Sequence, residues 1–119
     1  MSTRCNIVVR DGEEELWFYR HHDGYPESVL PDLEPLMERL REGSLRDNVG
    51  QFSGWLIITG HRGHGRVGGY DDWKVGDYEP TTGMHGDVAY VYEIDLRSRE
   101  LTAKACYGVE SRQMTPGDN

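Results

Sequence analysis

The sequence predicts an α+β fold, a single domain with a mostly antiparallel sheet and two helices packed on one of its faces. Strand-like runs lie at both ends of the chain, and residues with helical spacing lie between them. The length of 119 residues suits one compact domain. The expected order is strand, strand, helix, helix, long loop, strand, strand, all within residues 1–119. Residues 109–119 are expected to form a flexible tail.

The first two strands are predicted to form a hairpin. Residues 5–10 are rich in β-branched side chains, and Asp11-Gly12 is a strong turn signal. Residues 14–20 alternate, with aromatic side chains on both faces. The second strand should therefore lie inside the sheet or be covered on both sides, rather than form a bare edge.

A first helix is predicted from Asp32 to Arg41, because apolar residues recur there at steps of three and four. Gly43 is its expected stop. Pro31 and Pro35 suit only the early turns of a helix, so the helix is not extended toward the N-terminus.

A second helix is predicted from its N-cap at Asp47 to a glycine stop at Gly60. A strand over residues 55–59 is the alternative, since Gly50 and Gly54 each cost about 1 kcal/mol in a helix interior. If the helix forms, the spacing of these two glycines lets it lie close to the sheet.

The rest of the chain is expected to form a loop and a second hairpin. Residues 60–86 show no sustained period and are predicted to form a long irregular loop. Residues 88–96 alternate clearly and form the most evident strand of the chain. A turn over 97–100 then leads into a last strand over 101–107.

The net charge of −8 is unevenly distributed. Acidic residues concentrate between Asp11 and Glu38, and basic residues are in excess between Arg39 and Arg66. This pattern lacks the clustered cations of a generic nucleic-acid binder. It is compatible with an acidic face that meets a basic partner or imitates nucleic acid.

The composition also indicates a soluble intracellular protein. No stretch reaches the roughly 20 apolar residues of a membrane span, and the N-terminus has no export pattern. Cys5 and Cys106 are the only cysteines and are expected to be reduced thiols within strands.

The first candidate site lies where the second strand meets a turn. Arg20, His22, Asp23 and Tyr25 offer a cation, an imidazole, a carboxylate and a phenol for a polar ligand pocket. Strand alternation would place only one of the two adjacent histidines in such a pocket. The same segment also fits an ordinary turn, with Gly24 at positive φ.

His85 and Asp87 are predicted to form the opposite rim of the same pocket. They suit either an acid/base pair or a turn before a strand. Arg62 lies in a glycine-rich loop that can close over an anion, and Tyr78 offers a stacking face. Alternatively, the aromatic residues of this loop form a small hydrophobic cluster apart from the main core instead of binding a ligand. The loop lacks a Walker lysine, which argues against a mononucleotide fold.

No metal and no cofactor are predicted. The histidines and aspartates include suitable ligand types, but their spacing is not typical of a metal site. His61 and His64 also lie beside Arg62 and Arg66, which oppose a cation. No serine or cysteine lies in a recognisable nucleophile motif, so catalysis would depend on acid/base residues alone.

Three segments carry a family resemblance: residues 1–4, the block YRHHDGYP over 19–26, and the block YEPTTGMHGD over 78–87 with the strand after it. Together they resemble a family of small bacteriophage and prophage proteins. The resemblance spans most of the chain. It implies an accessory protein in the host cytoplasm that binds host machinery or host defence, and it implies no catalytic residues.

The favoured hypothesis is a non-enzymatic phage accessory or anti-defence protein that acts by binding. It would sequester a small anionic or nucleotide ligand, or mask a host protein with its acidic face. One alternative is a small metal-dependent or acid/base hydrolase using His22, Asp23, His85 and Asp87. Another is a virion or morphogenesis component. A homo-oligomer is compatible with each of these.

Overall fold

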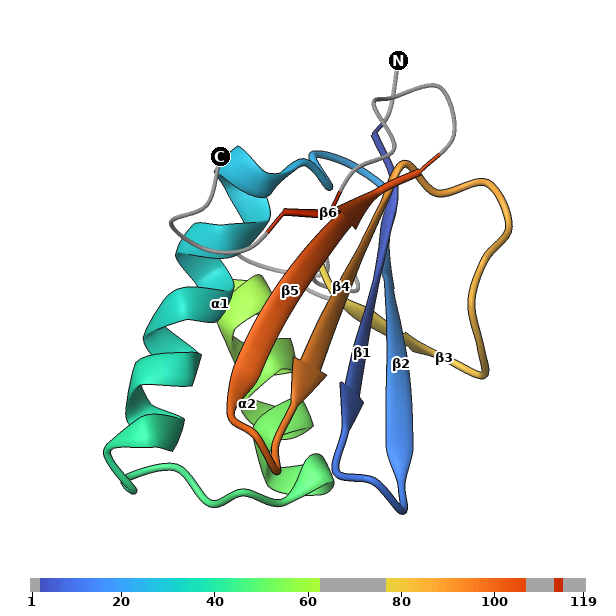
Figure 1. The fold of residues 1–119 in the computed structure, drawn as a ribbon. Coiled ribbons are helices and arrows are strands. Elements are labelled where there is room, and N and C mark those ends of the chain that lie inside the picture. Colours follow the sequence, from blue (N-terminus) through green and yellow to red (C-terminus); the bar gives the residue numbers. More distant parts are fainter. Residues whose placement is uncertain (1–2, 63–76, 107–112, 115–119) are drawn as a thin grey trace, which may run out of the picture.

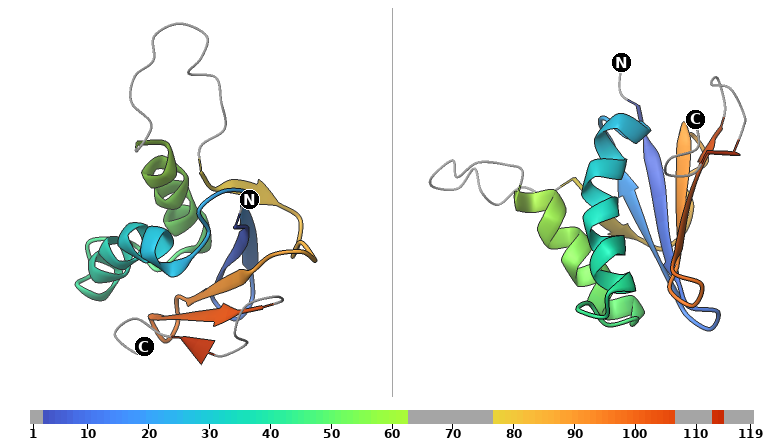
Figure 2. Two further views of the ribbon diagram at one scale, coloured as in Figure 1. Left: turned by 90° about the horizontal axis from the view of Figure 1, so that it is seen from above. Right: turned by 60° about the vertical axis from the view of Figure 1, so that its left-hand side comes forward.

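Two helices cover one face of a six-stranded sheet, which confirms the predicted α+β class (Figures 1 and 2). The structure is a computed structural model, and it describes residues 3–62, 77–106 and 113–114. Its elements are β1 (Cys5–Arg10), β2 (Glu15–Arg20), α1 (Pro26–Arg41), α2 (Val49–Arg62), β3 (Glu79–Thr81), β4 (Tyr90–Asp95), β5 (Glu100–Ala105) and β6 (Gln113–Met114). The strand order in space is β3-β2-β1-β4-β5-β6. All neighbouring strands are antiparallel except β1 and β4, which are parallel.

Strand β1 lies inside the sheet and is buried on both faces. Ile7 and Val9 belong to the core under the helices, and Ile7 pairs with Phe18 of β2. Asn6 and Val8 alternate with them and point to the other face, yet they are also 0% exposed. The sheet therefore needs cover on the side without helices as well.

The opening hairpin forms as predicted. Asp11 begins the turn, and its carboxylate accepts hydrogen bonds from the backbone N–H groups of Glu13 and Glu14 at 3.0 and 2.8 Å. These bonds hold the pKa of Asp11 below its usual value. Gly12 supplies the positive φ of 97° that the turn requires. Strand β2 then lies between β1 and β3, as its two aromatic faces suggested.

Helix α1 begins at Pro26, six residues before the predicted start at Asp32. Pro26 occupies the first helical position, where its missing N–H removes no helical bond. Pro31 and Pro35 lie inside the helix and are both exposed. The hydrogen bonds that they remove lie on the solvent side, where water can replace them. Burial of Val29 in the core favours the extra turns.

Helix α2 is helical throughout, so the strand alternative for residues 55–59 is wrong. Its cap is Asn48 rather than Asp47, because the Asn48 side-chain oxygen accepts the Gln51 backbone N–H at 2.9 Å. The helix also continues through Gly60 to Arg62 instead of stopping.

Gly60 stays in the helix because it makes room for Tyr78. A Cβ atom at Gly60 would lie 2.5 Å from the Tyr78 ring. The predicted role of Gly50 and Gly54 in bringing the helix close to the sheet is wrong. Among the described residues, a Cβ added at Gly54 would have no neighbour within 4 Å, and one added at Gly50 would meet only the Asn48 side chain.

Two short strands were not expected from the sequence. Strand β3 lies within the predicted loop 60–86 and pairs with β2. Strand β6 lies within the predicted tail and pairs with β5. The other residues of that tail, and residues 63–76 of the loop, lie outside the described part of the chain.

Both cysteines are free thiols. Cys5 is 0% exposed under the helices, and burial raises its pKa to about 12, partly opposed by the positive charge of Arg20. Cys106 is partly exposed just after β5.

Replacing Gly60 with alanine should destabilise the fold by about 1–3 kcal/mol, because the new methyl group overpacks against Tyr78. Gly54→Ala is the matched control in the same helix and should stabilise it by up to about 1 kcal/mol. Urea denaturation of both variants measures the difference. Equal stability of the two would show that Tyr78 does not pack against α2.

Cys5 should make stability fall in alkaline solution. The unfolded thiol ionises near its ordinary pKa of 9.0, whereas the folded thiol keeps its proton up to about pH 12. The stabilisation is therefore complete below pH 9 and is lost as the pH rises toward 12, by on the order of 1 kcal/mol per pH unit. Urea denaturation between pH 8 and pH 10 should show a shallower decline for Cys5→Ala. Parallel pH profiles of the two proteins would contradict this assignment.

Candidate functional site

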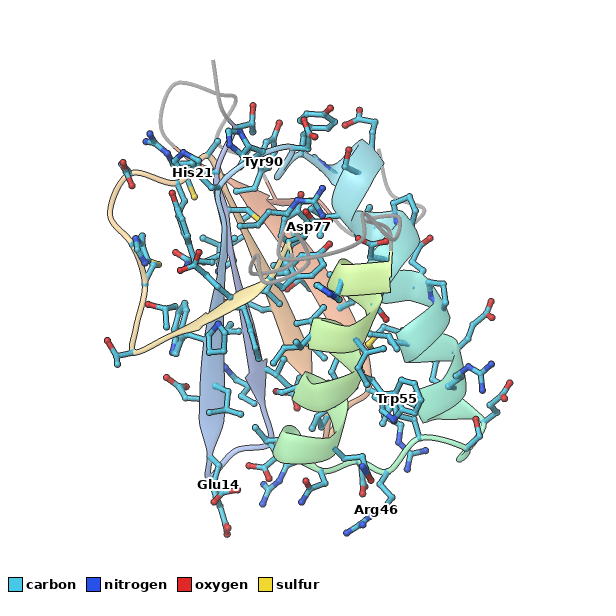
Figure 3. All side chains as sticks on the ribbon, turned by 180° about the vertical axis from the view of Figure 1, so that it is seen from behind. Glu14, His21, Arg46, Trp55, Asp77 and Tyr90 are labelled. Carbon is cyan, nitrogen blue, oxygen red and sulfur yellow. The ribbon has the colours of Figure 1, made fainter. Side chains whose placement is uncertain are left out.

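The residues predicted for one site separate onto the two faces of the sheet. Arg20 and Tyr78 lie on the side of the helices, whereas His85 stacks on Tyr19, whose side chain points to the opposite side. Figure 3 shows Asp77 near the end of α2 and His21 away from the helices. The predicted residues therefore belong to two separate clusters, and the prediction that they form two rims of one pocket is wrong.

The inner cluster consists of Arg20, Asp32, Asp77 and Tyr78. The Arg20 guanidinium donates from Nη1 to the Tyr78 hydroxyl at 2.8 Å and from Nε to the His22 carbonyl at 2.6 Å. The same Nη1 lies 3.4 Å from an Asp32 oxygen and 3.6 Å from an Asp77 oxygen. One cation thus joins β2, α1 and the segment before β3.

Tyr78 completes this cluster as a neutral phenol. Its hydroxyl donates to Asp32 at 2.7 Å, and its ring centroid lies 5.2 Å from the Arg20 guanidinium carbon. Burial raises the pKa of Tyr78 far above its usual value, and the hydrogen bond to Asp32 raises it further. The hydroxyl therefore keeps its proton and links the cation to the carboxylate.

Arg20, at the centre of the inner cluster, is suited to holding the fold together rather than to binding a ligand. Only 9% of the Arg20 side chain is exposed, and its guanidinium is engaged by groups of the same chain. Asp32 was predicted as the start of the first helix but not as a residue of the site. No sequence signal brings it to Arg20, which is why it was missed.

Asp23, Gly24 and Tyr25 lie in the short connection from β2 to α1, where the chain bends at His22 and Tyr25. The residue at positive φ is Asp23, at 56°, and not Gly24 as expected. Gly24 is needed for close approach, since a Cβ there would lie 2.8 Å from the Cβ of Cys5. The Tyr25 hydroxyl donates to the Asp23 carboxylate at 3.2 Å on the surface.

The outer cluster consists of Arg4, Tyr19, His21, His85 and Asp87. Tyr19 and His85 stack with ring centroids 4.1 Å apart, and the Tyr19 hydroxyl is hydrogen-bonded to His21 Nδ1 at 2.8 Å. Arg4 forms an ion pair with Asp87 at 2.6 Å. Tyr19 and Arg4 were not predicted as site residues.

Asn6 anchors this cluster to the sheet. Its side-chain oxygen accepts the backbone N–H of His85 at 2.9 Å, and its amide nitrogen donates to the Phe18 carbonyl at 3.0 Å. Thr81 contacts His85 Nε2 at 3.3 Å. The loop between β3 and β4 is thereby held against the side of the sheet without helices.

His21 and His22 follow the end of β2 at Arg20, so strand alternation does not separate them. Their rings meet edge to face with centroids 4.6 Å apart. His21, which was not a predicted site residue, contacts Tyr19. Among the described residues, no group of three His, Cys, Asp or Glu side chains is placed to hold a metal ion.

Arg62 is the last residue of α2, and its side chain lies outside the described part of the structure. The expectation that it closes over an anion therefore stays a prediction.

A groove that the sequence did not indicate runs between α1 and α2. Its volume is about 700 Å³, within the range of ligand-binding sites. It is lined by Pro31, Asp32, Pro35, Leu36, Arg39, Ser44, Leu45, Trp55 and Thr59. Trp55 projects from α2 toward α1 (Figure 3) and is 43% exposed. The available sequence signal was a large aromatic residue in a helix that contains no Asp, Glu or Lys and no Arg before Arg62.

Comparison with known proteins finds no matching family model, curated protein or solved structure. Within the described residues, no helix is long and apolar enough to cross a membrane. The resemblance to phage proteins therefore stays a prediction.

Removing the Tyr78 hydroxyl should destabilise the fold by about 1–2 kcal/mol, because Arg20 and Asp32 each lose a buried hydrogen bond. Tyr25→Phe is the matched control, since its hydroxyl bonds only the exposed Asp23, and it should change stability by less than about 0.5 kcal/mol. Thermal and urea denaturation of Tyr78→Phe and the control measure both effects. Equal losses in the two variants would contradict a structural role for the inner cluster.

Proposed function

We propose that this protein acts by binding a segment of another protein in the groove between α1 and α2. The observation that carries this proposal is the exposed Trp55 beside the groove of about 700 Å³. Partly exposed tryptophans at the centre of a concave surface are frequent anchors of protein interfaces, since they bury a large apolar area when the partner arrives.

Helix α2 also exposes apolar side chains that do not line the groove. Trp55, Ile57 and Ile58 are each between 38 and 45% exposed. A helix that remains apolar on its outer side is typical of an element with a further partner. Buried Leu36 and Leu45 add apolar side chains to the groove itself.

Only part of the predicted acidic face, the acids on α1, supports this proposal. The acidic turn over residues 11–14 precedes β2 and Asp23 follows it, so these acids are at opposite ends of that strand. On α1, Asp32 lines the groove, and Glu27, Glu34 and Glu38 of the same helix are exposed. They favour a partner with a basic surface around the docked segment.

The resemblance to phage and prophage proteins gives the proposal its setting. A small protein that covers a binding surface of a host protein suits an accessory or anti-defence role in the host cytoplasm. Sequestering a small anion receives less support, because Arg20 is largely buried and already bound within the chain.

The hydrolase alternative receives no specific support either. Asp23 is bound by Tyr25, Asp87 by Arg4, and His85 is stacked on Tyr19. Three of the four residues of the proposed acid/base set therefore make contacts that stabilise loops of the fold.

Replacing Trp55 with alanine should remove most binding of the partner while leaving the fold intact. Tagged wild-type protein, Trp55→Ala and Met84→Ala are compared by affinity capture from a bacterial lysate with quantitative mass spectrometry. Met84 is the control because it is apolar and 61% exposed but does not line the groove. A partner bound by the wild type and the control should decrease about tenfold or more with Trp55→Ala.

A partner captured equally by all three proteins would contradict a docking role for the groove. Calorimetric titration with nucleotides tests the small-anion alternative. Nucleotide binding that is unaffected by Trp55→Ala would replace the present proposal with that alternative.

A further inference from the structure

The groove between α1 and α2 carries opposite charges toward its two ends. Asp32 and Arg39 both line it and are seven residues apart on α1. At the helical rise of about 1.5 Å per residue, they are separated by about 10 Å along the helix axis. The Arg39 carbonyl accepts the backbone N–H groups of Ser44 and Leu45, so Arg39 marks the end where the chain turns into α2.

A partner entering at the Asp32 end meets a carboxylate rather than a guanidinium. The Asp32 side chain is 30% exposed, whereas that of Arg20, its ion-pair partner, is only 9% exposed. The hydrogen bond from Tyr78 holds the carboxylate in a defined position. A positioned and partly exposed carboxylate is a suitable contact for a lysine or arginine of a partner.

At the other end, Arg39 presents a cation. Arg39 is exposed, and its side chain makes no ion pair with the other described residues. A cation without an internal carboxylate partner is able to pair with an acidic side chain that arrives from outside.

We infer that the groove selects a short protein segment with three features: a basic side chain for Asp32, a large apolar side chain against Trp55, and an acidic side chain for Arg39. This inference rests on the proposed function, because it describes the partner of the same groove. The two charged side chains of the partner must lie about 10 Å apart. That spacing corresponds to about three residues of an extended segment or about seven residues of a helix.

The test uses synthetic peptides, the full chain and fluorescence anisotropy. Each labelled peptide has a central leucine or tryptophan and two flanking charges, at extended or helical spacing. Four charge patterns are compared: one basic with one acidic residue, two basic residues, two acidic residues, and two neutral glutamines. The wild type should bind the mixed pattern about two- to fivefold more tightly than each of the other three.

The variant Arg39→Glu provides the decisive comparison, because it changes one exposed charge and leaves the inner cluster untouched. It should shift the preference to the pattern with two basic residues by about the same factor. Arg39→Gln is the matched control and should remove the preference for an acidic residue without creating a new one. An unchanged order of peptide affinities in Arg39→Glu would overturn the inference.

The variant Trp55→Ala separates this inference from the proposed function. If Trp55→Ala weakens all peptides about tenfold or more but charge pattern has no effect, the groove binds protein segments and the charge selection is wrong. If Trp55→Ala has no effect on peptides or on partner capture, the groove is not the binding site. In that case both proposals fail.

Discussion

The buried guanidinium of Arg20 is the interaction on which the arrangement of α1, β2 and β3 depends. Removing a guanidinium from water is costly unless its donors and its charge are matched inside the protein. The matching groups are the His22 carbonyl, the Tyr78 hydroxyl and the Asp32 carboxylate, which come from three segments of the chain. Satisfying this one side chain sets the end of β2, the early turns of α1 and the start of β3 relative to one another.

The fold class was predictable because periodicity is a local property of the sequence. Alternation at both ends and helical spacing between them gave the α+β class, both hairpins and both helices. The early start of α1 was hidden because Pro31 and Pro35 are breakers in most helices, and only the solvent on their side makes them tolerable here. Strand β3 was hidden because three residues, one of them proline, show no period.

The candidate site was less predictable, because it is made of contacts between distant segments. Arg20 and Tyr78 were each predicted as site residues, but no pattern in the sequence pairs residues that are 58 positions apart. The predicted separation of His21 from His22 requires a strand, but β2 ends at Arg20, so side chains no longer alternate there. The exposure of Trp55 was not predictable either, because it depends on tertiary packing and not on the local pattern.

The parallel pairing of β1 with β4 has a consequence for how the protein folds. Cys5 lies beside Tyr90, so the central pair of strands joins segments that are far apart along the chain. Each hairpin is able to form early from neighbouring residues, but their union requires closure of a very long loop, which slows folding. During translation, β1 therefore has one edge and much of its apolar surface open until β4 has left the ribosome. In that interval the open edge of β1 is able to pair with the wrong strand.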